Sequence, residues 1–115
     1  MATILYGIKN CDTVKKACDW LNEAAITYQF HDFRANGLST TKLNTWLNAV
    51  GGEKLINRRS ATWKQLSEKE RKNIDAGEGK LTILANPTLI KRPVLEHGGK
   101  IYNGFDSELY AQIFK

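Results

Sequence analysis

The residue best placed for chemistry is Cys11, which stands between a short apolar run and a segment with helical spacing. A thiol at the start of a helix faces unpaired backbone N–H groups and the positive end of the helix dipole, and both favour its thiolate form. Basic and polar residues surround it in the sequence: Lys9, Asn10, Asp12, Thr13, Lys15 and Lys16. Because the thiolate is the nucleophilic form of cysteine, the pattern predicts thiol chemistry at Cys11. The competing interpretation is an ordinary buried cysteine, which the polar neighbours disfavour.

The second cysteine, Cys18, is a less suitable reaction partner. It falls in an apolar stripe with Val14 and Leu21, which predicts burial in the core. The spacing of seven residues places the two cysteine Cα atoms about 10 Å apart if both belong to one helix, beyond the ~7 Å limit for a disulfide. The sequence therefore predicts a single reactive thiol, and a resolving role for Cys18 would require the helix to unwind at its start.

The elements that must position Cys11 can be predicted from the periodicity. Residues 4–6 form an apolar strand, residues 14–25 an amphipathic helix, and residues 27–33 alternate as a second strand. A strand, a helix and a strand within about thirty residues form a βαβ unit, so the two strands are expected to be parallel neighbours. Cys11 then lies at the corner between the first strand and its helix.

The middle of the chain predicts helices and no strand. Ser39 and Ser67 are candidate N-caps of two helices. The segments between and after these helices are read as two short turns and one further short helix: residues 53–56, 62–66 and 80–86. Together these elements form a helical insert over about residues 39–86.

The end of the chain returns to strands. Residues 94–96 and 100–103 are expected to pair as a hairpin around a glycine turn, and a closing helix follows from its candidate cap Asp106. The complete order is β-α-β, helical insert, β-β-α. This order predicts one α/β domain over residues 1–115 with a mixed sheet.

That order resembles the ArsC/Spx family, whose members have a thioredoxin-like fold with a helical insert. The segments that carry the resemblance are residues 6–17, 55–59, 62–66, 86–87 and 90–94. The resemblance covers essentially the whole chain, and it is greatest to small members of the family regarded as glutathione-dependent thiol reductases. It implies that Cys11 is the nucleophile and that Pro93, preceded by Arg92, forms a cis peptide bond facing it.

The chain departs from two branches of this family. Arsenate reductases of the family gather three arginines around the thiol, and Arg92 matches one of them. Asn57 stands at the second position and the third falls near Asn103, so arsenate reduction is the weaker functional alternative. Many Spx regulators carry a Cys-x-x-Cys redox switch, whose second position is Val14 here. The resemblance thus favours chemistry with one thiol.

The function that the sequence favours is a monothiol oxidoreductase, a thiol or disulfide reductase with glutathione as co-substrate and no bound cofactor. Cys11 is the predicted nucleophile, and Arg92 is the predicted thiolate stabiliser and carboxylate clamp. The predicted substrate-binding residues are Lys9, Asn10, Thr13, Arg58, Arg59 and Pro93. Arg58 and Arg59 are indistinguishable from sequence, and a solvated helix end explains them equally well. The main alternative is a Spx-like adaptor that docks on RNA polymerase without catalysis.

Composition limits the expected partners. The net charge is +5 and the pI about 9.3, but the basic residues are spread along the chain and mixed with acidic ones, so we expect no direct nucleic-acid binding. The sequence shows no export signal and no apolar run of about 18 residues, which predicts a cytoplasmic protein without membrane contact. His31 and His97 lack companions, so no metal site is expected. We expect a monomer.

Overall fold

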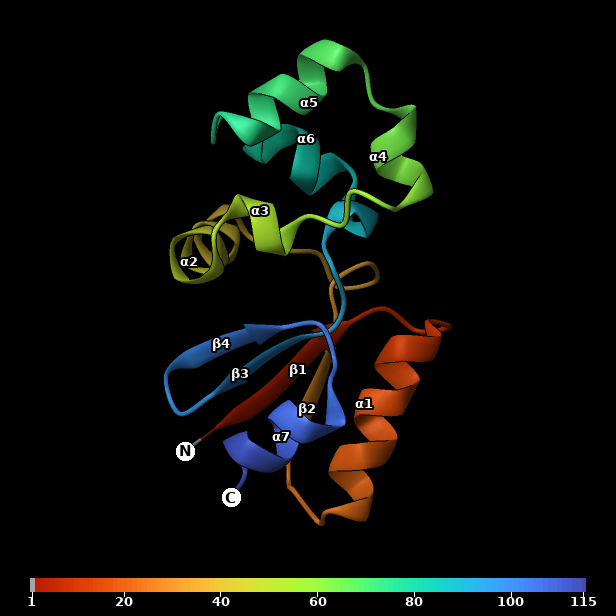
Figure 1. Cartoon of the computed structure of the whole chain (residues 1–115), viewed down its shortest axis with the longest axis vertical. Coiled ribbons are helices and arrows are strands. Elements are labelled where there is room, and N and C mark those ends of the chain that lie inside the picture. The colour runs from red at the N-terminus through yellow and green to blue at the C-terminus, as the bar shows by residue number, and fades with distance from the viewer. Residues whose placement is uncertain (1) are drawn as a thin grey trace. The chain divides into compact units, whose positions relative to one another are not determined.

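The computed structural model describes residues 2–115, which divide into two compact units. The sheet unit comprises the chain up to Asn36 together with Arg92–Lys115, and the helical unit comprises Gly37–Lys91 (Figure 1). The helical unit matches the insert predicted over residues 39–86, with a few more residues at each end. That both units belong to one domain stays a prediction.

The sheet unit is built on a mixed sheet in the order β2-β1-β3-β4. Its elements in chain order are β1 (Thr3–Gly7), α1 (Asp12–Glu23), β2 (Gln29–Asp32), β3 (Val94–His97), β4 (Lys100–Asn103) and α7 (Ser107–Ile113). β1 pairs in parallel with β2 and antiparallel with β3, which pairs antiparallel with β4. The parallel pair confirms the predicted βαβ unit. The arrangement confirms the α/β, thioredoxin-like fold with a mixed sheet.

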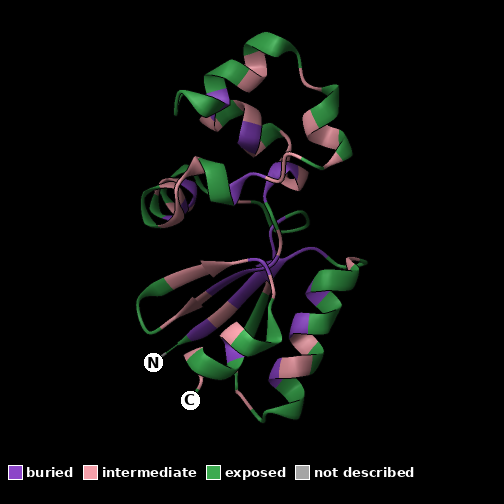
Figure 2. Cartoon of the chain, viewed as in Figure 1, coloured by how far each residue is buried: buried purple, intermediate pink, exposed green. Residues whose placement is uncertain are grey.

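The helices of this unit share one hydrophobic core with the sheet. Leu5 of β1 and Leu95 of β3 are directly paired and fully buried. They cluster with Ala17 and Leu21 of α1 and with Tyr110 of α7, all of which are also fully buried (Figure 2). Burial of each leucine side chain contributes about 1.5–3 kcal/mol. The cluster therefore fixes α1 against the sheet, and with it the start of the helix at the end of β1.

The helical unit consists of short helices. They are α2 (Thr40–Val50), α3 (Gly52–Leu55), α4 (Ala61–Gln65), α5 (Glu68–Asp75), α6 (Lys80–Ala85) and the 3-10 helix η1 (Pro87–Leu89). Ser39 accepts a hydrogen bond from Lys42 N–H at the start of α2. Ser67 forms a reciprocal capping box with Glu70 at the start of α5. Both predicted N-caps are therefore confirmed.

Two segments of the helical unit differ from the prediction. The sequence predicts turns over residues 53–56 and 62–66, whereas α3 and α4 are short helices of four and five residues. α3 begins directly after Gly51, whose φ of 82° ends α2, and Ser60 caps α4 by accepting a hydrogen bond from Trp63 N–H. Helices this short complete little more than one turn, so their apolar spacing shows no period to detect.

The helical unit also contains fully or nearly fully buried hydrophobic side chains. Its buried hydrophobic side chains are Leu43, Trp46, Leu55, Ile56, Ile74, Ile83, Leu89 and Ile90. Trp46 of α2 is fully buried. An antiparallel bridge between Ile56 and Ile90 ties the segment after α3 to the segment after η1. Among the described residues, no helix is long and apolar enough to cross a membrane.

Candidate active site

Cys11 occupies the predicted corner between β1 and α1. It is the N-cap residue of α1, with an extended backbone (φ −116°, ψ 121°), and its carbonyl accepts the hydrogen bond from Lys15 N–H at 2.9 Å. Its side chain makes no capping hydrogen bond, is half-buried and forms no disulfide. The thiol is therefore accessible, and it lies at the end of α1 where backbone N–H groups are unpaired.

The sequence shapes this corner through a close approach of strand and helix. A Cβ atom at Gly7, the last residue of β1, would lie 2.8 Å from a methyl carbon of Val14 in the first turns of α1. A side chain at this position would therefore have to displace the Val14 side chain, and glycine avoids the clash. Asn10, directly before the cysteine, has a φ of 64°, a conformation that asparagine tolerates better than most residues. The local backbone therefore sets the direction in which the thiol emerges.

Asp32 fixes the loop that carries the thiol, a role that the sequence alone does not predict. Its carboxylate, at the end of β2, accepts hydrogen bonds from Lys9 N–H (3.2 Å), Arg34 N–H (2.9 Å) and Ala35 N–H (3.0 Å). The pKa of Asp32 is held below its usual value, chiefly by the hydrogen bond from Ala35 N–H. The hydrogen bonds from Lys9 and Arg34 and the charge of Lys9 add to this effect, and burial opposes it. An aspartate followed by a turn after a strand is typical of such a carboxylate.

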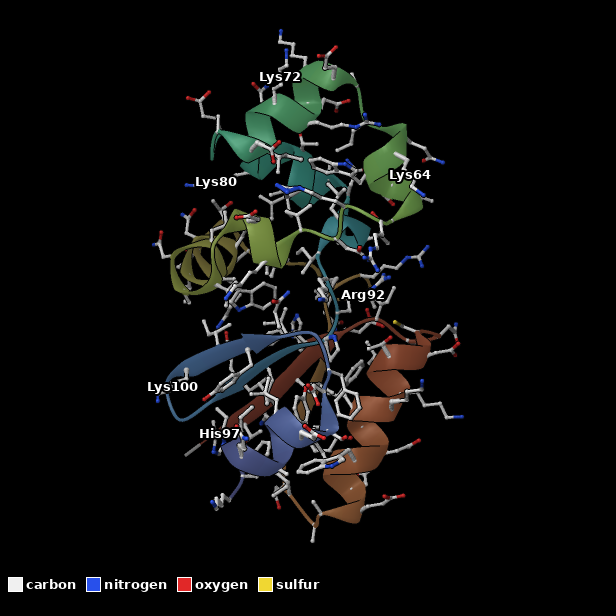
Figure 3. The ribbon with its side chains drawn as sticks, in the orientation of Figure 1. Lys64, Lys72, Lys80, Arg92, His97 and Lys100 are labelled. Carbon is white, nitrogen blue, oxygen red and sulfur yellow. The ribbon has the colours of Figure 1, made fainter. Side chains whose placement is uncertain are left out.

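Arg92 and Pro93 lie at the same end of β1 as this loop. The Arg92–Pro93 peptide bond is cis, as the resemblance implies. Tyr6 is opposite Val94 in the β1–β3 register, so the two residues before Val94 run beside the end of β1. Pro93 is buried, and its carbonyl accepts a hydrogen bond from Gly104 N–H at 2.8 Å. Arg92 is half-buried and lies just before β3, an inner strand of the sheet (Figure 3).

A groove of about 720 Å³ opens beside the thiol. The residues that line it are Ile8, Lys9, Asn10, Cys11, Asp12, Val14, Lys15, Cys18 and Phe30. Two of the predicted substrate-binding residues, Lys9 and Asn10, thus share a surface with the predicted nucleophile. Thr13 is exposed in the first turn of α1 and is not part of the lining. Arg92 and Pro93 are also outside it, on the β3 side of β1.

Cys18 is less buried than the apolar stripe predicts. It packs against the core cluster of the sheet unit, but its side chain is half-buried and also lines the groove that Cys11 lines. Burial and a hydrogen bond with Cys18 raise the pKa of Tyr28 to about 12. The apolar stripe of α1 correctly predicts that Cys18 contacts the core. It does not predict the partial exposure of Cys18, which arises because the neighbouring strand β2 is at the edge of the sheet.

The two candidate arginines of the helical unit differ in their surroundings. The Arg58 guanidinium forms an ion pair with Asp75 and stacks over the Trp63 ring, 5.2 Å from its centroid. Arg59 is exposed, and its backbone N–H donates to Asn57 Oδ1 at 3.1 Å. Of the two, Arg59 therefore presents its side chain to solvent, while Arg58 is held within the helical unit. A substrate contact by either stays a prediction.

Asn57, which stands where arsenate reductases of the family carry an arginine, shapes the chain before α4. Its side-chain oxygen accepts from Arg59 N–H, and its carbonyl accepts from the Ser60 hydroxyl at 2.8 Å. Ser60 in turn caps α4. Since these contacts use the acceptor groups of Asn57 to form a turn, the residue has a structural role that an anion-binding arginine does not replace.

The two histidines contact aromatic rings and polar side chains of the sheet unit. The His31 ring lies 5.1 Å from that of Tyr6, and His97 Nδ1 lies 2.7 Å from the Thr3 hydroxyl. Across residues 2–115, no three His, Cys, Asp or Glu side chains are grouped as metal binding requires.

Comparison with known proteins places both units in one family. The ArsC family profile matches residues 6–113, nearly the whole chain. A solved YffB protein is 40% identical with a TM-score of 0.90, over 96% of this chain and 97% of that chain. The solution structure of an arsenate reductase (ArsC) related protein from Brucella melitensis is 44% identical with a TM-score of 0.78, over 100% of this chain and 96% of that chain.

A regulatory protein is also among the relatives. A global transcriptional regulator Spx from Lactiplantibacillus plantarum is 28% identical, over 91% of this chain and 80% of its own length. The family profile includes the cysteine corner, the helical unit and the Arg92–Pro93 segment. The predicted family is therefore confirmed, and this chain belongs to the ArsC family.

Proposed function

We propose that this protein is a thiol oxidoreductase that reduces disulfides with Cys11 as its single nucleophile and glutathione as co-substrate, in the cytosol. The observation that carries the proposal is the accessible thiol of Cys11 at the start of α1, beside a groove and at the same end of β1 as Arg92. Membership of a family that includes arsenate reductases supports redox chemistry at this thiol.

The proposed reaction needs one protein thiol. The Cys11 thiolate attacks the glutathione sulfur of a mixed disulfide RS–SG, so that the Cys11–S–SG bond forms and the thiol RSH leaves after taking up a proton. A second glutathione, as thiolate, then attacks the bound glutathione sulfur. This step releases oxidised glutathione and restores the Cys11 thiolate. The net reaction is RS–SG + GSH → RSH + GSSG, in which the disulfide of the substrate is reduced and glutathione is oxidised.

The proposed binding roles follow from charge and place. Arg92 pairs with a carboxylate of glutathione and stabilises the thiolate, because a guanidinium binds carboxylates through two parallel hydrogen bonds. Lys9 adds positive charge to the groove, while Asn10 and Thr13 offer polar side chains on either side of the cysteine. Asp32 acts on the reaction through the loop that it holds.

Turnover by two matched cysteine variants tests this proposal. Cys11→Ser is expected to lose glutathione-dependent reduction of hydroxyethyl disulfide by roughly a thousandfold or more, because the nucleophile is removed. Cys18→Ser is expected to continue turning over, since no step uses a second protein thiol. An equal loss in both variants would contradict the monothiol route and indicate an intramolecular dithiol cycle.

The second candidate function is a Spx-like adaptor that docks on RNA polymerase. The similarity to a Spx regulator over 91% of this chain favours it. Docking uses a protein surface, so the adaptor binds RNA polymerase equally well after Cys11 is alkylated, whereas an enzyme loses its activity. A pull-down with intact and alkylated protein separates the two functions. Arsenate reduction is disfavoured, because Asn57 is engaged in a turn and Asn103 is not basic.

A further inference from the structure

We propose that the groove between α1 and β2 binds the non-glutathione half of the disulfide substrate, and that this half is a neutral or anionic thiol with an aryl or alkyl group. The inference deepens the proposed function and rests on it for the identity of the glutathione half. The groove supplies the two features that select such a group: an apolar wall and a rim with excess positive charge.

The candidate site has two sides. β1 is flanked by β2 on one side and by β3 on the other, and Cys11 follows the end of β1. The groove belongs to the β2 side, while Arg92 and Pro93 belong to the β3 side and do not line it. A mixed disulfide also has two halves that extend in different directions from its sulfur atoms. If the glutathione half extends toward Arg92, the groove is free to bind the other half of the disulfide.

Part of the groove lining is apolar. Ile8 and Val14 are 6% and 4% exposed, so they contribute a fixed surface. Phe30 is paired with Leu5 in the β1–β2 register, and it lies on the sheet face that α1 covers. Its side chain is nevertheless 37% exposed, which is unusual for a large hydrophobic residue of this chain. An aryl or alkyl group beside Phe30 would cover apolar surface that water now contacts.

The length of the groove limits the size of this group. Cys11 and Cys18 both line it, and they are separated by two turns of α1, about 10 Å at a rise of 1.5 Å per residue. The half-buried Cys18 therefore marks how far the groove extends from the reacting sulfur. A single benzyl or short alkyl substituent fits this span, and the groove volume of about 720 Å³ lies in the range of small-molecule sites.

The charge of the rim sets the expected charge of the substrate. Lys9, Lys15 and Asp12 line the groove, and the two lysines are exposed. Two cations against one carboxylate leave an excess of positive charge. A cationic thiol half is therefore repelled, and a neutral or anionic one is accepted.

The test measures how fast Cys11 takes glutathione from three mixed disulfides whose other halves are benzyl mercaptan, 2-mercaptoethanol and cysteamine. Each single-turnover rate is followed by mass spectrometry of the Cys11 adduct and divided by the rate of the same disulfide with free glutathione. This division removes differences in intrinsic reactivity. The wild type is expected to prefer the benzyl compound to the hydroxyethyl compound by roughly tenfold, and to use the cysteamine compound least.

Variants at two exposed apolar residues provide the control. Phe30→Ser is expected to reduce the benzyl preference to near unity, and Phe30→Leu to keep part of it, because leucine restores apolar surface. Leu81→Ser, in α6 of the helical unit where the side chain is 82% exposed, is expected to keep the full preference. Equal normalised rates in the wild type, or a benzyl preference that survives Phe30→Ser, would overturn the proposal.

A second readout separates this proposal from the proposed function. Alkylation of Cys11 by N-benzylmaleimide and by N-methylmaleimide requires no glutathione. The groove is expected to favour the benzyl reagent in the wild type and in Leu81→Ser, but not in Phe30→Ser. No glutathione transfer with a retained maleimide preference would refute the function and keep the groove. Glutathione transfer without any benzyl preference would refute the role of the groove and keep the proposed function. A preference that disappears as a dimer forms in sedimentation would assign the groove to a second copy of the chain and refute the proposal.

Discussion

The sheet unit and the helical unit use their conspicuous side chains in opposite ways. In the sheet unit, Cys11 is accessible and makes no capping hydrogen bond, although the loop around it is fixed by Asp32. In the helical unit, Arg58 is bound to Asp75 and stacks on Trp63. Segments of both units carry the family resemblance. A family motif therefore includes both candidate reactive residues and residues that hold the fold, and the contacts of their side chains distinguish the two kinds.

Removal of the Trp63 ring should destabilise the helical unit and leave the chemistry intact. The indole contacts two guanidinium groups, those of Arg58 at 5.2 Å and Arg71 at 6.0 Å from its centroid. Trp63→Ala is expected to lower the free energy of unfolding by about 2 kcal/mol, below the ~3–5 kcal/mol of a fully buried ring because Trp63 is half-buried. Urea unfolding measures this change. A loss within ~0.5 kcal/mol, as for an ordinary surface substitution, would contradict the structural role.

Two arginines, one from each unit, are expected to respond differently to substitution. Arg92→Ala is expected to raise the KM for glutathione roughly tenfold, because a charged hydrogen-bonded pair contributes about 1.5–3 kcal/mol. Arg71 donates from Nε to the Trp63 carbonyl and from a terminal nitrogen to the Lys64 carbonyl. Arg71→Ala is therefore expected to lower stability and leave the KM unchanged. Steady-state kinetics and urea unfolding distinguish the two outcomes, and an unchanged KM in Arg92→Ala would reassign Arg92 to structure.

The smallest expected effect is at Asp32. Because the folded state lowers the pKa of this carboxyl, its ionised form contributes stability above the ordinary aspartate pKa of 3.8, and that contribution is lost as the pH falls below it. Asp32→Asn is expected to cost about 1 kcal/mol at pH 7 and to weaken the dependence of stability on pH below about 4. Thermal unfolding between pH 3 and pH 7 measures both. Parallel curves for wild type and variant would show that Asp32 does not titrate as described.

The cysteine corner was predictable because its cause is local. The switch from an apolar run to helical spacing occurs between Tyr6 and Val14, and Gly7 and Cys11 lie between them. The structure adds that Gly7 is required by the contact with Val14, which the sequence does not reveal. The same locality explains why both serine N-caps were predicted correctly, since a cap and its partner are three residues apart.

The parts that the sequence did not predict depend on contacts between distant residues. Asp32 bonds to the backbone of Lys9, 23 residues earlier, and a backbone N–H leaves no mark on residue type. Arg58 and Arg59 are adjacent and chemically identical, so only the position of Asp75 in α5 distinguishes them. Phe30 belongs to a segment whose alternation predicts a strand, and its exposure follows from the position of β2 at the edge of the sheet.

The most direct test of the account is mass spectrometry of the intact protein and of its peptides after incubation with oxidised glutathione. We expect one glutathione adduct per chain, on the peptide that contains Cys11, and none on the peptide that contains Cys18. An adduct that forms first on Cys18, or no adduct under conditions in which free cysteine reacts, would contradict the claim that Cys11 is the reacting thiol of this protein.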